Sequence, residues 1–567
     1  MNPIIECVPN YSEGRDKSII DAIVAAIRSV EGVQVLDVDP GEATNRTVVT
    51  FVGAPEPVCE AAFQGARKAR ELIDMRQHHG AHPRSGATDV LPLIPVAGIT
   101  LEACAVLARK LAERLYKELD IPCYCYEAAA FKPERKNLAV CRAGEYEALP
   151  EKMADPERRP DFGGAYNETA ARAGATNVGA RNFLVAVNFN LNTTSTRRAM
   201  AVAFDVREKG RKAREGGSLT GKLLKDENGR QLWIPGTLKG CKAIGWYIDE
   251  YGIAQVSMNI TDIDVTPLHI AYEEVCRAAA ARGLKVTGTE IVGLVPKRVL
   301  LEAGRFYLEK QQRSLGIREE EILKIAVRSM SLDDLMPFNP KEKVIEFLMA
   351  DEAALARRHR LIRMSAEGFA RETASESAAP GGGSVSAYMG SLGAALATMV
   401  ANLSAHKRGW DSRWKEFSDV AEKGQALLNE LLDLVDEDTA AFDRIMACLG
   451  MPKGTDEEKA ARAKALEEAT LYAASVPLKT MEASLKALPL ALEMARQGNP
   501  ASASDAGVAA LAAVAGIQGA RLNVRINAAG LSDKTPALPL LERADAIVAQ
   551  AEALEAEVLS QVDSLIG

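Results

Sequence analysis

The chain has 567 residues, which is too many for one hydrophobic core, so two or three domains are expected. Its net charge of -8 argues against nucleic acid as the main partner. The first residues, MNPIIECVPNYSEG, do not read as a secretory signal, and the Ala-rich stretch near 506–516 is too short to span a membrane. The nine scattered cysteines include no CxxC pair, which predicts reduced thiols in a cytoplasmic protein.

The first block of the chain, to about residue 182, alternates β-branched runs with amphipathic segments. Residues 32–39 and 47–52 have the composition of strands, whereas apolar residues recur at helical spacing over 58–75. This alternation predicts a sheet packed with helices.

A second α/β block starts at Phe183. Its predicted strands are FLVAVNFNL, AIGWYID and AQVSMNIT, and a helix is expected over residues 269–282. Residues 216–240 carry GG, DENG and PG turn signals, which predict a loop or a small hairpin.

From about Arg360 the sequence is rich in Ala, Leu, Glu and Lys, and strand patterns disappear. This composition predicts a separate all-α bundle. Between the blocks, residues 331–350 are interpreted as a linker with a docking helix.

A histidine-rich loop, MRQHHGAHPRSGATDVLPLIP, holds His78, His79 and His82. A metal site is disfavoured because Gly80 and Pro83 interrupt the helix on which His78 and His82 would share a face, and the HExxH glutamate is missing. The remaining interpretations are a solvated loop without function and a general base, since imidazole titrates near neutral pH.

Other polar groups are expected near the histidines. Arg84 and Asp89 lie close by in sequence, where they can orient a base or bind an anion. Two loops at predicted strand ends, VPNYSEG with Asn10 and DVDPG with Asp39, are candidates for the same site. Each loop alone is weak, because Asp-Pro-Gly is also simply a turn.

In the helical region, a Gly-rich segment containing Gly382, Gly383 and Ser384 leads into an apolar helix. It lacks the GK[ST] end of a phosphate-binding loop, yet such a helix start exposes backbone N–H groups to a ligand. Tight helix packing explains the small residues equally well.

A second helix, over residues 428–449, carries an apolar stripe that includes Val435, Phe442 and Leu449. Asp438 lies on this stripe, three residues after Val435 and four before Phe442. A carboxylate among apolar neighbours is costly unless it is paired, protonated or used, and burial moves its pKa toward that of a useful acid or base. The alternative is a satisfied buried aspartate.

The remaining acidic residues of that helix, Asp433, Asp436 and Asp443, fall on the opposite face, and Asp436 is expected to be solvated. A third segment, SASDAG, begins another Ala-rich helix, for which Ser504 or Asp505 is the expected N-cap.

The segments VPNYSEGR, LDVDPGEATNRTVVTFVG, HHGAHPRSGATDVLP, AGEYEALPEK, DFGGAYNETAARAGATNVGARNFLVAVNFNLNT and IVGLVPKRVLL together resemble the formiminotransferase domain of the formiminotransferase-cyclodeaminase family. The resemblance implies transfer of the formimino group from N-formimino-L-glutamate to N5 of tetrahydrofolate during histidine breakdown. It places the catalytic histidine at His82 and folate contacts over 163–174, including Gly163, Gly164 and Gly174. We further expect Asp39 to orient His82, Asn10 to hold the pterin or formimino group, and Arg46 or Arg84 to bind carboxylates.

The helical segments, with SVPL at 475–478, resemble the cyclodeaminase domain of the same family. The resemblance implies closure of 5-formimino-tetrahydrofolate to 5,10-methenyl-tetrahydrofolate with loss of ammonia. It maps the catalytic aspartate onto Asp438 and adds Gly382, Gly383, Ser384 and Asp505 as binding residues. Two alternatives stay open, a methenyl-tetrahydrofolate cyclohydrolase in this half and a non-catalytic folate-binding scaffold.

The expected fold is therefore an α/β formiminotransferase unit of two ferredoxin-like subdomains, followed by an antiparallel helical bundle. Its expected divisions are 1–181, 182–328, a linker over 329–359, and 360–567. The co-substrate is tetrahydrofolate, and a polyglutamylated form is consistent with transfer of the intermediate between sites. No metal, nucleic acid or membrane is expected. The resemblance also implies a homo-oligomer, built from dimers and extending to an octamer.

Overall fold

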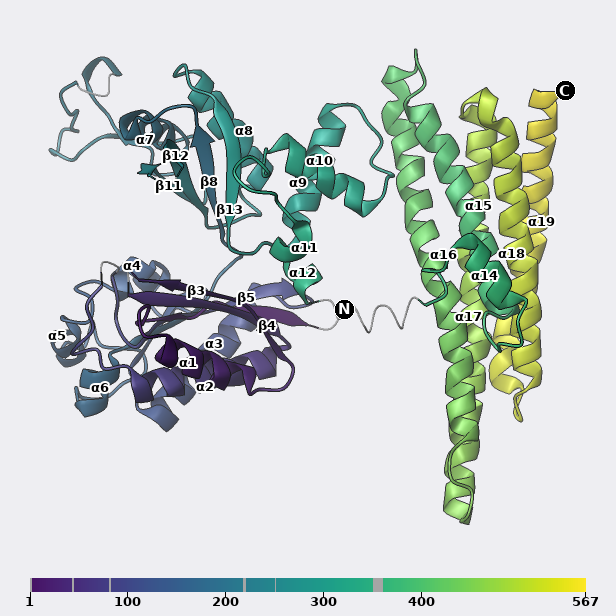
Figure 1. Cartoon of the computed structure of the whole chain (residues 1–567), viewed down its shortest axis with the longest axis horizontal. Coiled ribbons are helices and arrows are strands. Elements are labelled where there is room, and N and C mark those ends of the chain that lie inside the picture. The colour runs from purple at the N-terminus through teal and green to yellow at the C-terminus, as the bar shows by residue number, and fades with distance from the viewer. Residues whose placement is uncertain (1–2, 43–44, 81–82, 218–220, 250, 350–359) are drawn as a thin grey trace. The chain divides into compact units, whose positions relative to one another are not determined.

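The computed structural model spans the chain, and the structure describes residues 3–42, 45–80, 83–217, 221–249, 251–349 and 360–567 (Figure 1). These residues form two compact units: Met1–Ala303 with Met330–Met349, and Gly304–Ser329 with Ala350–Gly567. The first is the α/β unit and the second is the helical unit.

The first subdomain of the α/β unit contains a seven-stranded sheet. From one edge to the other its order is β3, β4, then the short strands β1 and β2 end to end, then β5, β7 and β6. Pro9 separates β1 from β2, since proline has no N–H to continue the ladder. The strands are β1 (Ile4–Cys7), β2 (Asn10–Tyr11), β3 (Val33–Gly41), β4 (Arg46–Gly53), β5 (Thr88–Ala97), β6 (Cys123–Glu127) and β7 (Thr176–Ala180).

Three amphipathic helices, α1 (Lys17–Arg28), α2 (Pro55–Leu72) and α3 (Leu101–Leu119), contribute to one core with alternate residues of these strands. That core includes Ile5, Phe51 and Leu91. The intervening residues of the strands therefore point to the opposite face of the sheet. Shorter helices follow in the chain: α4 (Leu138–Cys141), α5 (Leu149–Ala154) and α6 (Glu168–Ala173).

The second subdomain is a four-stranded antiparallel sheet in the order β11-β12-β8-β13. Its elements are β8 (Val185–Leu191), α7 (Thr196–Val206), β11 (Cys241–Ile248), β12 (Ile253–Ile260), α8 (Leu268–Ala280) and β13 (Val286–Val292). Residues 216–240 belong to an excursion closed by a two-residue pairing of β9 (Arg211–Lys212) with β10 (Trp233–Ile234), which confirms the small hairpin.

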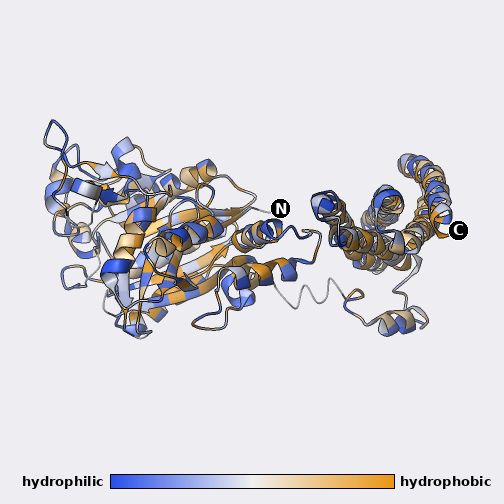
Figure 2. Cartoon of the chain, turned by 90° about the horizontal axis from the view of Figure 1, so that it is seen from above, coloured by the Kyte–Doolittle hydropathy of each residue, from blue (hydrophilic) through white to orange (hydrophobic). Residues whose placement is uncertain are grey.

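Both subdomains share one topology, a β-α-β-β-α-β order whose first strand lies between the third and the fourth. In the first subdomain this order is β1-α1-β3-β4-α2-β5, with α3, β6 and β7 added at the β5 edge. The ferredoxin-like fold expected from the sequence is thereby confirmed. Figure 2 shows the hydrophobic residues concentrated in the strands of this unit.

The linker region holds two single-turn helices, α11 (Pro340–Lys343) and α12 (Ile345–Leu348). It docks on the α/β unit by main-chain bonds, since Val295 N donates to Lys343 O and Ile345 N donates to Val295 O. The predicted docking helix is thus two short helices, which Val344 separates in an extended conformation.

The helical unit is a bundle of long helices: α15 (Gly382–Ala405), α16 (Trp414–Leu449), α17 (Asp456–Gln497), α18 (Ala503–Ala529) and α19 (Leu538–Ile566). The short helix α14 (Ala366–Thr373) precedes them, and α10 (Glu319–Ser329) with the end of α9 (Lys297–Lys310) belongs to the same unit. Gly316 permits this association, because a Cβ there would lie 2.3 Å from the main chain of Ala421. The expected boundary at 328 stays a prediction.

Two bundle helices are long and apolar enough, by length and composition, to cross a membrane: Gly382–Ala405 and Pro500–Ala529. Over half of each apolar window is buried inside the unit, 61% and 56% respectively. Their apolar character is accounted for by the bundle core, which includes Ala394, Ala397, Ala513 and Ile517. The α16–α17 hairpin extends beyond the ends of the other bundle helices (Figure 1).

Candidate active sites

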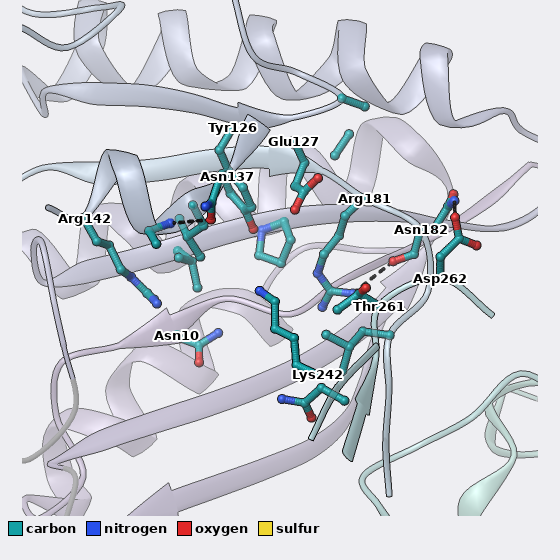
Figure 3. A pocket seen from close by; sticks show the side chains of 18 of the residues that line it. Asn10, Tyr126, Glu127, Asn137, Arg142, Arg181, Asn182, Lys242, Thr261 and Asp262 are labelled. Carbon is teal, nitrogen blue, oxygen red and sulfur yellow. Dashed lines mark hydrogen bonds between the residues drawn. The ribbon is translucent and has the colours of Figure 1, made fainter. Parts of the chain in front are cut away.

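The α/β unit contains a cavity of about 890 Å³ that residues of both subdomains line (Figure 3). This size falls in the range of sites for small organic ligands, about 300–1,000 Å³. The first subdomain contributes Asn10, Arg46, Tyr126, Glu127, Arg142 and Arg181, and the second contributes Lys242, Asn259, Thr261 and Asp262. The lining therefore mixes cationic, anionic and amide groups.

Asn10 and Arg46 lie side by side on neighbouring strands, and Arg46 Nη2 donates a hydrogen bond to Asn10 Oδ1. Burial lowers the pKa of Arg46 to about 10. At neutral pH the guanidinium stays charged, so it supplies a cation in a partly desolvated place. Both residues line the cavity, as the sequence led us to expect for a substrate contact. Their roles stay predictions.

Arg142 is fixed by a buried carboxylate behind the cavity wall. Its Nη2 and Nε donate to Asp89, whose side chain is 1% exposed, and Ser85 N also donates to Asp89. Asp89 was singled out in the sequence as a group that orients a base or binds an anion. In the structure it orients an arginine, Arg142, which lines the cavity.

Two further cations come from opposite subdomains. Arg181 follows β7, Lys242 lies on β11, and both extend into the cavity in Figure 3. Burial raises the pKa of the nearby Glu127, and Lys242 and Arg181 oppose this rise. Anionic ligand groups between these cations would replace part of the solvent that now screens them.

The histidine loop is only partly described by the structure. His78 is buried, and its Nε2 lies 2.8 Å from the carbonyl oxygen of Asn45, while Arg84 Nε donates to its Nδ1 over 3.4 Å. Both ring nitrogens are thus engaged, and burial lowers the pKa of His78. His78 is a neutral structural residue, and His79 is exposed. His82 lies outside the described residues, whereas Pro83, the next in sequence, lines the cavity.

Arg84 is occupied by protein carboxylates. Its guanidinium pairs with Glu145 at 3.1 Å and Glu147 at 2.7 Å, and its side chain is 12% exposed. It is absent from the described cavity lining, so a contact with a substrate carboxylate would require that these pairs open. Among the expected loop residues, Asp39 lies exposed on β3 and is also outside this lining.

The glycines expected to contact folate have structural roles. Gly174 has φ 68° and pairs with Gly86, and a Cβ on it would lie 2.3 Å from Ser85 O. Gly163 packs near Pro160, and neither it nor Gly164 lines the described cavity. Contacts of these glycines with folate stay predictions.

In the helical unit, Asp438 belongs to α16, and its side chain lies against the N-terminus of the neighbouring helix α15. A Cβ on Gly383 would lie 2.1 Å from Asp438 Oδ1, so only glycine admits the carboxylate there. Ser384 Oγ donates to Asp438 Oδ2 at 3.1 Å. Because this hydroxyl hydrogen is used, Thr439 Oγ1, 3.2 Å away, donates to Ser384 Oγ.

The protonation of Asp438 is set by two opposed effects. Burial raises its pKa, while hydrogen bonds from the hydroxyl and the backbone N–H of Ser384 lower it. The end of α15 also favours the anion, because unpaired N–H groups and the helix dipole meet there. The net direction is upward, which suits a carboxyl group that exchanges a proton.

Asp438 lines a small cavity of about 120 Å³. Its other lining groups are Ala378, Ala379, Gly381, Gly382, Gly383, Thr439, Phe442, Ile445, Ala473, Asn523 and Asn527. The Gly-rich segment and Asp438, which were predicted separately from the sequence, both line this cavity. The chemical role of Asp438 stays a prediction.

Two expectations for this unit are wrong. Asp436 is buried rather than solvated, since its carboxylate accepts hydrogen bonds from Leu361 N at 2.8 Å and Ile362 N at 3.2 Å. The N-cap of α18 is Ser502, not Ser504 or Asp505. Asp505 is in the first turn of α18 and does not line the cavity with Asp438, so its folate contact stays a prediction.

Several lining residues were not identified from the sequence. Arg142, Arg181 and Lys242 sit at strand ends or on loops whose meeting requires the fold. Asn523 and Asn527 had a readable signal, because two asparagines four apart in an Ala-rich helix occupy one face.

Three segments of the chain match known protein families. Residues 4–181 match "Formiminotransferase domain, N-terminal subdomain", 186–350 match "Formiminotransferase domain", and 365–546 match "Formiminotransferase-cyclodeaminase". The chain is thus a folate-dependent transferase unit joined to a cyclodeaminase unit.

Individual proteins similar to this chain fall into the same families. Formimidoyltransferase-cyclodeaminase of Rattus norvegicus is 41% identical over 564 residues, which is 100% of this chain and 99% of that protein. Glutamate formimidoyltransferase of Streptococcus pyogenes is 39% identical, covering 54% of this chain and 94% of its own length. Methenyltetrahydrofolate cyclohydrolase of Methylorubrum extorquens is 40% identical, over 35% of this chain and 96% of its own length. The chain belongs to the formimidoyltransferase-cyclodeaminase family.

Proposed function

We propose that the α/β unit transfers the formimino group of N-formimino-L-glutamate to N5 of tetrahydrofolate and that the helical unit closes the product to 5,10-methenyl-tetrahydrofolate and ammonia. The observation that carries this proposal is the full-length match to formimidoyltransferase-cyclodeaminases, with a cavity in each unit at the expected segments. These reactions would place the enzyme in histidine degradation and one-carbon metabolism.

In the transfer step, N5 of tetrahydrofolate attacks the formimino carbon, and the bond from this carbon to the glutamate nitrogen breaks. The proton that leaves N5 must reach the departing nitrogen. We propose that His82 carries it, as a neutral imidazole first and an imidazolium second. Arg46, Arg181 and Lys242 give the cavity the cations that carboxylates of both substrates require.

In the cyclisation step, N10 attacks the formimino carbon attached to N5, and ammonia leaves. Starting from the protonated formimino group (=NH2+), N10 loses one proton and the departing nitrogen gains one, which gives the methenyl cation and ammonia, so a single carboxyl group can serve as base and then as acid. Asp438 fits this role by its place in the small cavity and by its raised pKa.

The second candidate function for the helical unit is methenyl-tetrahydrofolate hydrolysis, because a cyclohydrolase is 40% identical over 200 residues. The α/β unit favours deamination, since its product is the substrate of that reaction. A non-catalytic scaffold is less consistent with a glycine that admits the Asp438 carboxylate to a helix end.

The deciding experiment gives the full chain formiminoglutamate and tetrahydrofolate and follows both the methenyl chromophore and ammonia. We expect His82→Ala to abolish transfer. We expect Asp438→Ala to accumulate 5-formimino-tetrahydrofolate, with losses of about 10²–10⁴-fold in the affected step. Wild type that forms neither product would refute the proposed function, and methenyl hydrolysis without ammonia release would favour the second candidate.

We also propose a homo-oligomer assembled from dimers, extending to an octamer. Leu392, Met399 and Leu403 form an exposed apolar stripe on α15, and Val508 and Leu511 are exposed on the adjacent α18. An apolar surface of this kind marks an interaction site, and a second copy of the chain is the proposed occupant. Sedimentation velocity of the full chain tests it, and a monomer at micromolar concentration would contradict it.

Two finer points complete the proposal. A cytoplasmic location fits the nine cysteines, all of which are free thiols. A polyglutamylated tetrahydrofolate would suit a cavity lined by several cations. Assays that compare mono- and polyglutamylated tetrahydrofolate test the second point, and equal KM values for the two forms would contradict it.

A further inference from the structure

The cavity around Asp438 holds two amide side chains that the proton-transfer step does not use. Asn523 and Asn527 lie one helical turn apart on α18, and both line this cavity. A Cβ on Gly382, another lining residue, would lie 3.2 Å from Asn523 Nδ2 and 3.5 Å from its Oδ1. The amide of Asn523 therefore packs directly against the start of α15.

Hydrogen bonds to the main chain fix the orientation of both amides. Asn523 Nδ2 donates to Gly519 O at 2.9 Å, and Asn527 Nδ2 donates to Ala473 O at 2.7 Å. Among the described residues, neither Oδ1 atom accepts a hydrogen bond from another group. Each asparagine lines the cavity and keeps a carbonyl oxygen, an acceptor with two lone pairs, that no described protein group occupies.

The side chains of this cavity offer mainly hydrogen-bond acceptors, while the N–H groups at the start of α15 face the Asp438 carboxylate. The cavity's polar side chains are Asp438, Thr439, Asn523 and Asn527, and no Lys, Arg or His is among its described lining residues. At about 120 Å³ it is smaller than a site for a whole small-molecule ligand. Such a space suits the reacting end of a larger substrate, and its acceptors suit a group rich in N–H donors.

The departing group of the proposed cyclisation has these donors. After N10 attacks, the central carbon carries an NH2 group with two N–H bonds and one lone pair. Asp438 delivers a proton to the lone pair, and two acceptors remain necessary for the two N–H bonds. A hydroxyl group in the same position, as in hydrolysis of the methenyl bridge, has one donor only.

We propose that Asn523 and Asn527 bind the departing amino group of the cyclodeaminase reaction through their Oδ1 atoms and thereby select ammonia over water. This inference rests on the proposed function of the helical unit. It assigns these two residues to the substrate nitrogen, Asp438 to the proton, and Ser384 to the position of Asp438.

The test uses the full chain in the reverse direction, with 5,10-methenyl-tetrahydrofolate and ammonium as substrates. We expect Asn523→Ala and Asn527→Ala each to raise the KM for ammonium about tenfold, the value of one hydrogen bond near 1.4 kcal/mol. The KM for methenyl-tetrahydrofolate should stay within about twofold. The forward kcat should fall about tenfold, as the ammonium KM rises. Asn523→Ser and Asn527→Ser, which also remove the carbonyl, should give the same result.

The control is Asn429→Ala, an exposed asparagine on α16 that bonds to Gln425. Formiminotransferase activity and the helical circular dichroism of each variant report on folding. The inference is overturned if the ammonium KM stays at the control value, or if both KM values rise together. Those results count against the asparagines when wild type is active, whereas an inactive wild type refutes the proposed function itself.

Discussion

The two units hold their key side chains by different physical means. In the α/β unit, ion pairs and hydrogen bonds between charged groups from separate strands and loops fix the cavity wall, as Arg142 on Asp89 illustrates. In the helical unit, one carboxylate sits against the end of a neighbouring helix, where a glycine makes room for it. The first arrangement depends on charge balance and the second on space, so different substitutions should damage each.

The largest effect should come from removing a partner of the buried pair. Arg142→Met leaves the Asp89 carboxylate, 1% exposed, without its cation. Breaking such a pair costs about 3–5 kcal/mol, so we expect a lower calorimetric transition for the α/β unit and loss of transferase activity.

This charge-balance interpretation is sharpened by a double change. Arg142→Met with Asp89→Asn removes the unpaired charge and should recover part of the stability. Arg76→Met is the matched control, because Arg76 pairs with Asp74 and Glu168 at the surface. If Arg142→Met destabilises the α/β unit no more than Arg76→Met does, the ion pair of Arg142 with Asp89 does not stabilise the cavity lining.

The second effect tests the role of space in the helical unit. Gly383→Ala puts a Cβ 2.1 Å from Asp438 Oδ1, so the carboxylate must move. A misplacement near 1 Å costs about 10²-fold in rate, and we expect this loss in cyclodeaminase kcat with transferase activity retained.

The control for this variant is Gly507→Ala in α18, where the nearest atom to an added Cβ is 3.5 Å away. It should leave both rates within about twofold, since helical glycine is replaced by alanine at little cost. Equal cyclodeaminase rates of Gly383→Ala and Gly507→Ala would contradict the claim that the space beside Gly383 positions Asp438.

The smallest effect concerns pH. Ser384→Ala removes a hydroxyl that stabilises the Asp438 carboxylate, so the pKa of Asp438, already raised by burial, rises further. Since the first step requires the ionised form, the acidic limb of the cyclodeaminase pH profile should move to higher pH. We expect a loss of about tenfold on that limb, the value of a bond to a charged acceptor, and little loss on the plateau.

Ser391→Ala is the control for the pH profile, because Ser391 Oγ donates to the carbonyl oxygen of Tyr388 in the same helix. A profile of Ser384→Ala that falls equally at every pH would show that the hydroxyl supports folding rather than the ionisation of Asp438.

Local patterns sufficed to predict most elements. The β-branched run at 47–52 and the helical spacing in 58–75 correspond to β4 and α2, because β-branched residues favour strands and a helix that covers a sheet has apolar residues at a helical period. The same arithmetic placed Asp438 apart from the polar face of α16. It failed for Asp436, because Leu361 and Ile362, distant in sequence, supply the donors that make its burial tolerable.

The charged wall was less predictable for a related reason. Arg142, Arg181 and Lys242 come from three places in the chain, and neither spacing nor composition shows that they meet. Arg84 shows the converse. Its sequence neighbours suggested an anion site, yet Glu145 and Glu147 occupy its guanidinium.

The contact between Gly383 and Asp438 also limits which missense changes the codon of Gly383 tolerates. Every single-base missense change in a glycine codon introduces a residue with a Cβ, and at position 383 that atom would collide with the carboxylate. No conservative allele exists there, whereas a codon such as that of Gly507 tolerates alanine. Inherited variation at residue 383 would thus separate the two activities of one polypeptide, leaving carriers with a working transferase and a stalled second step.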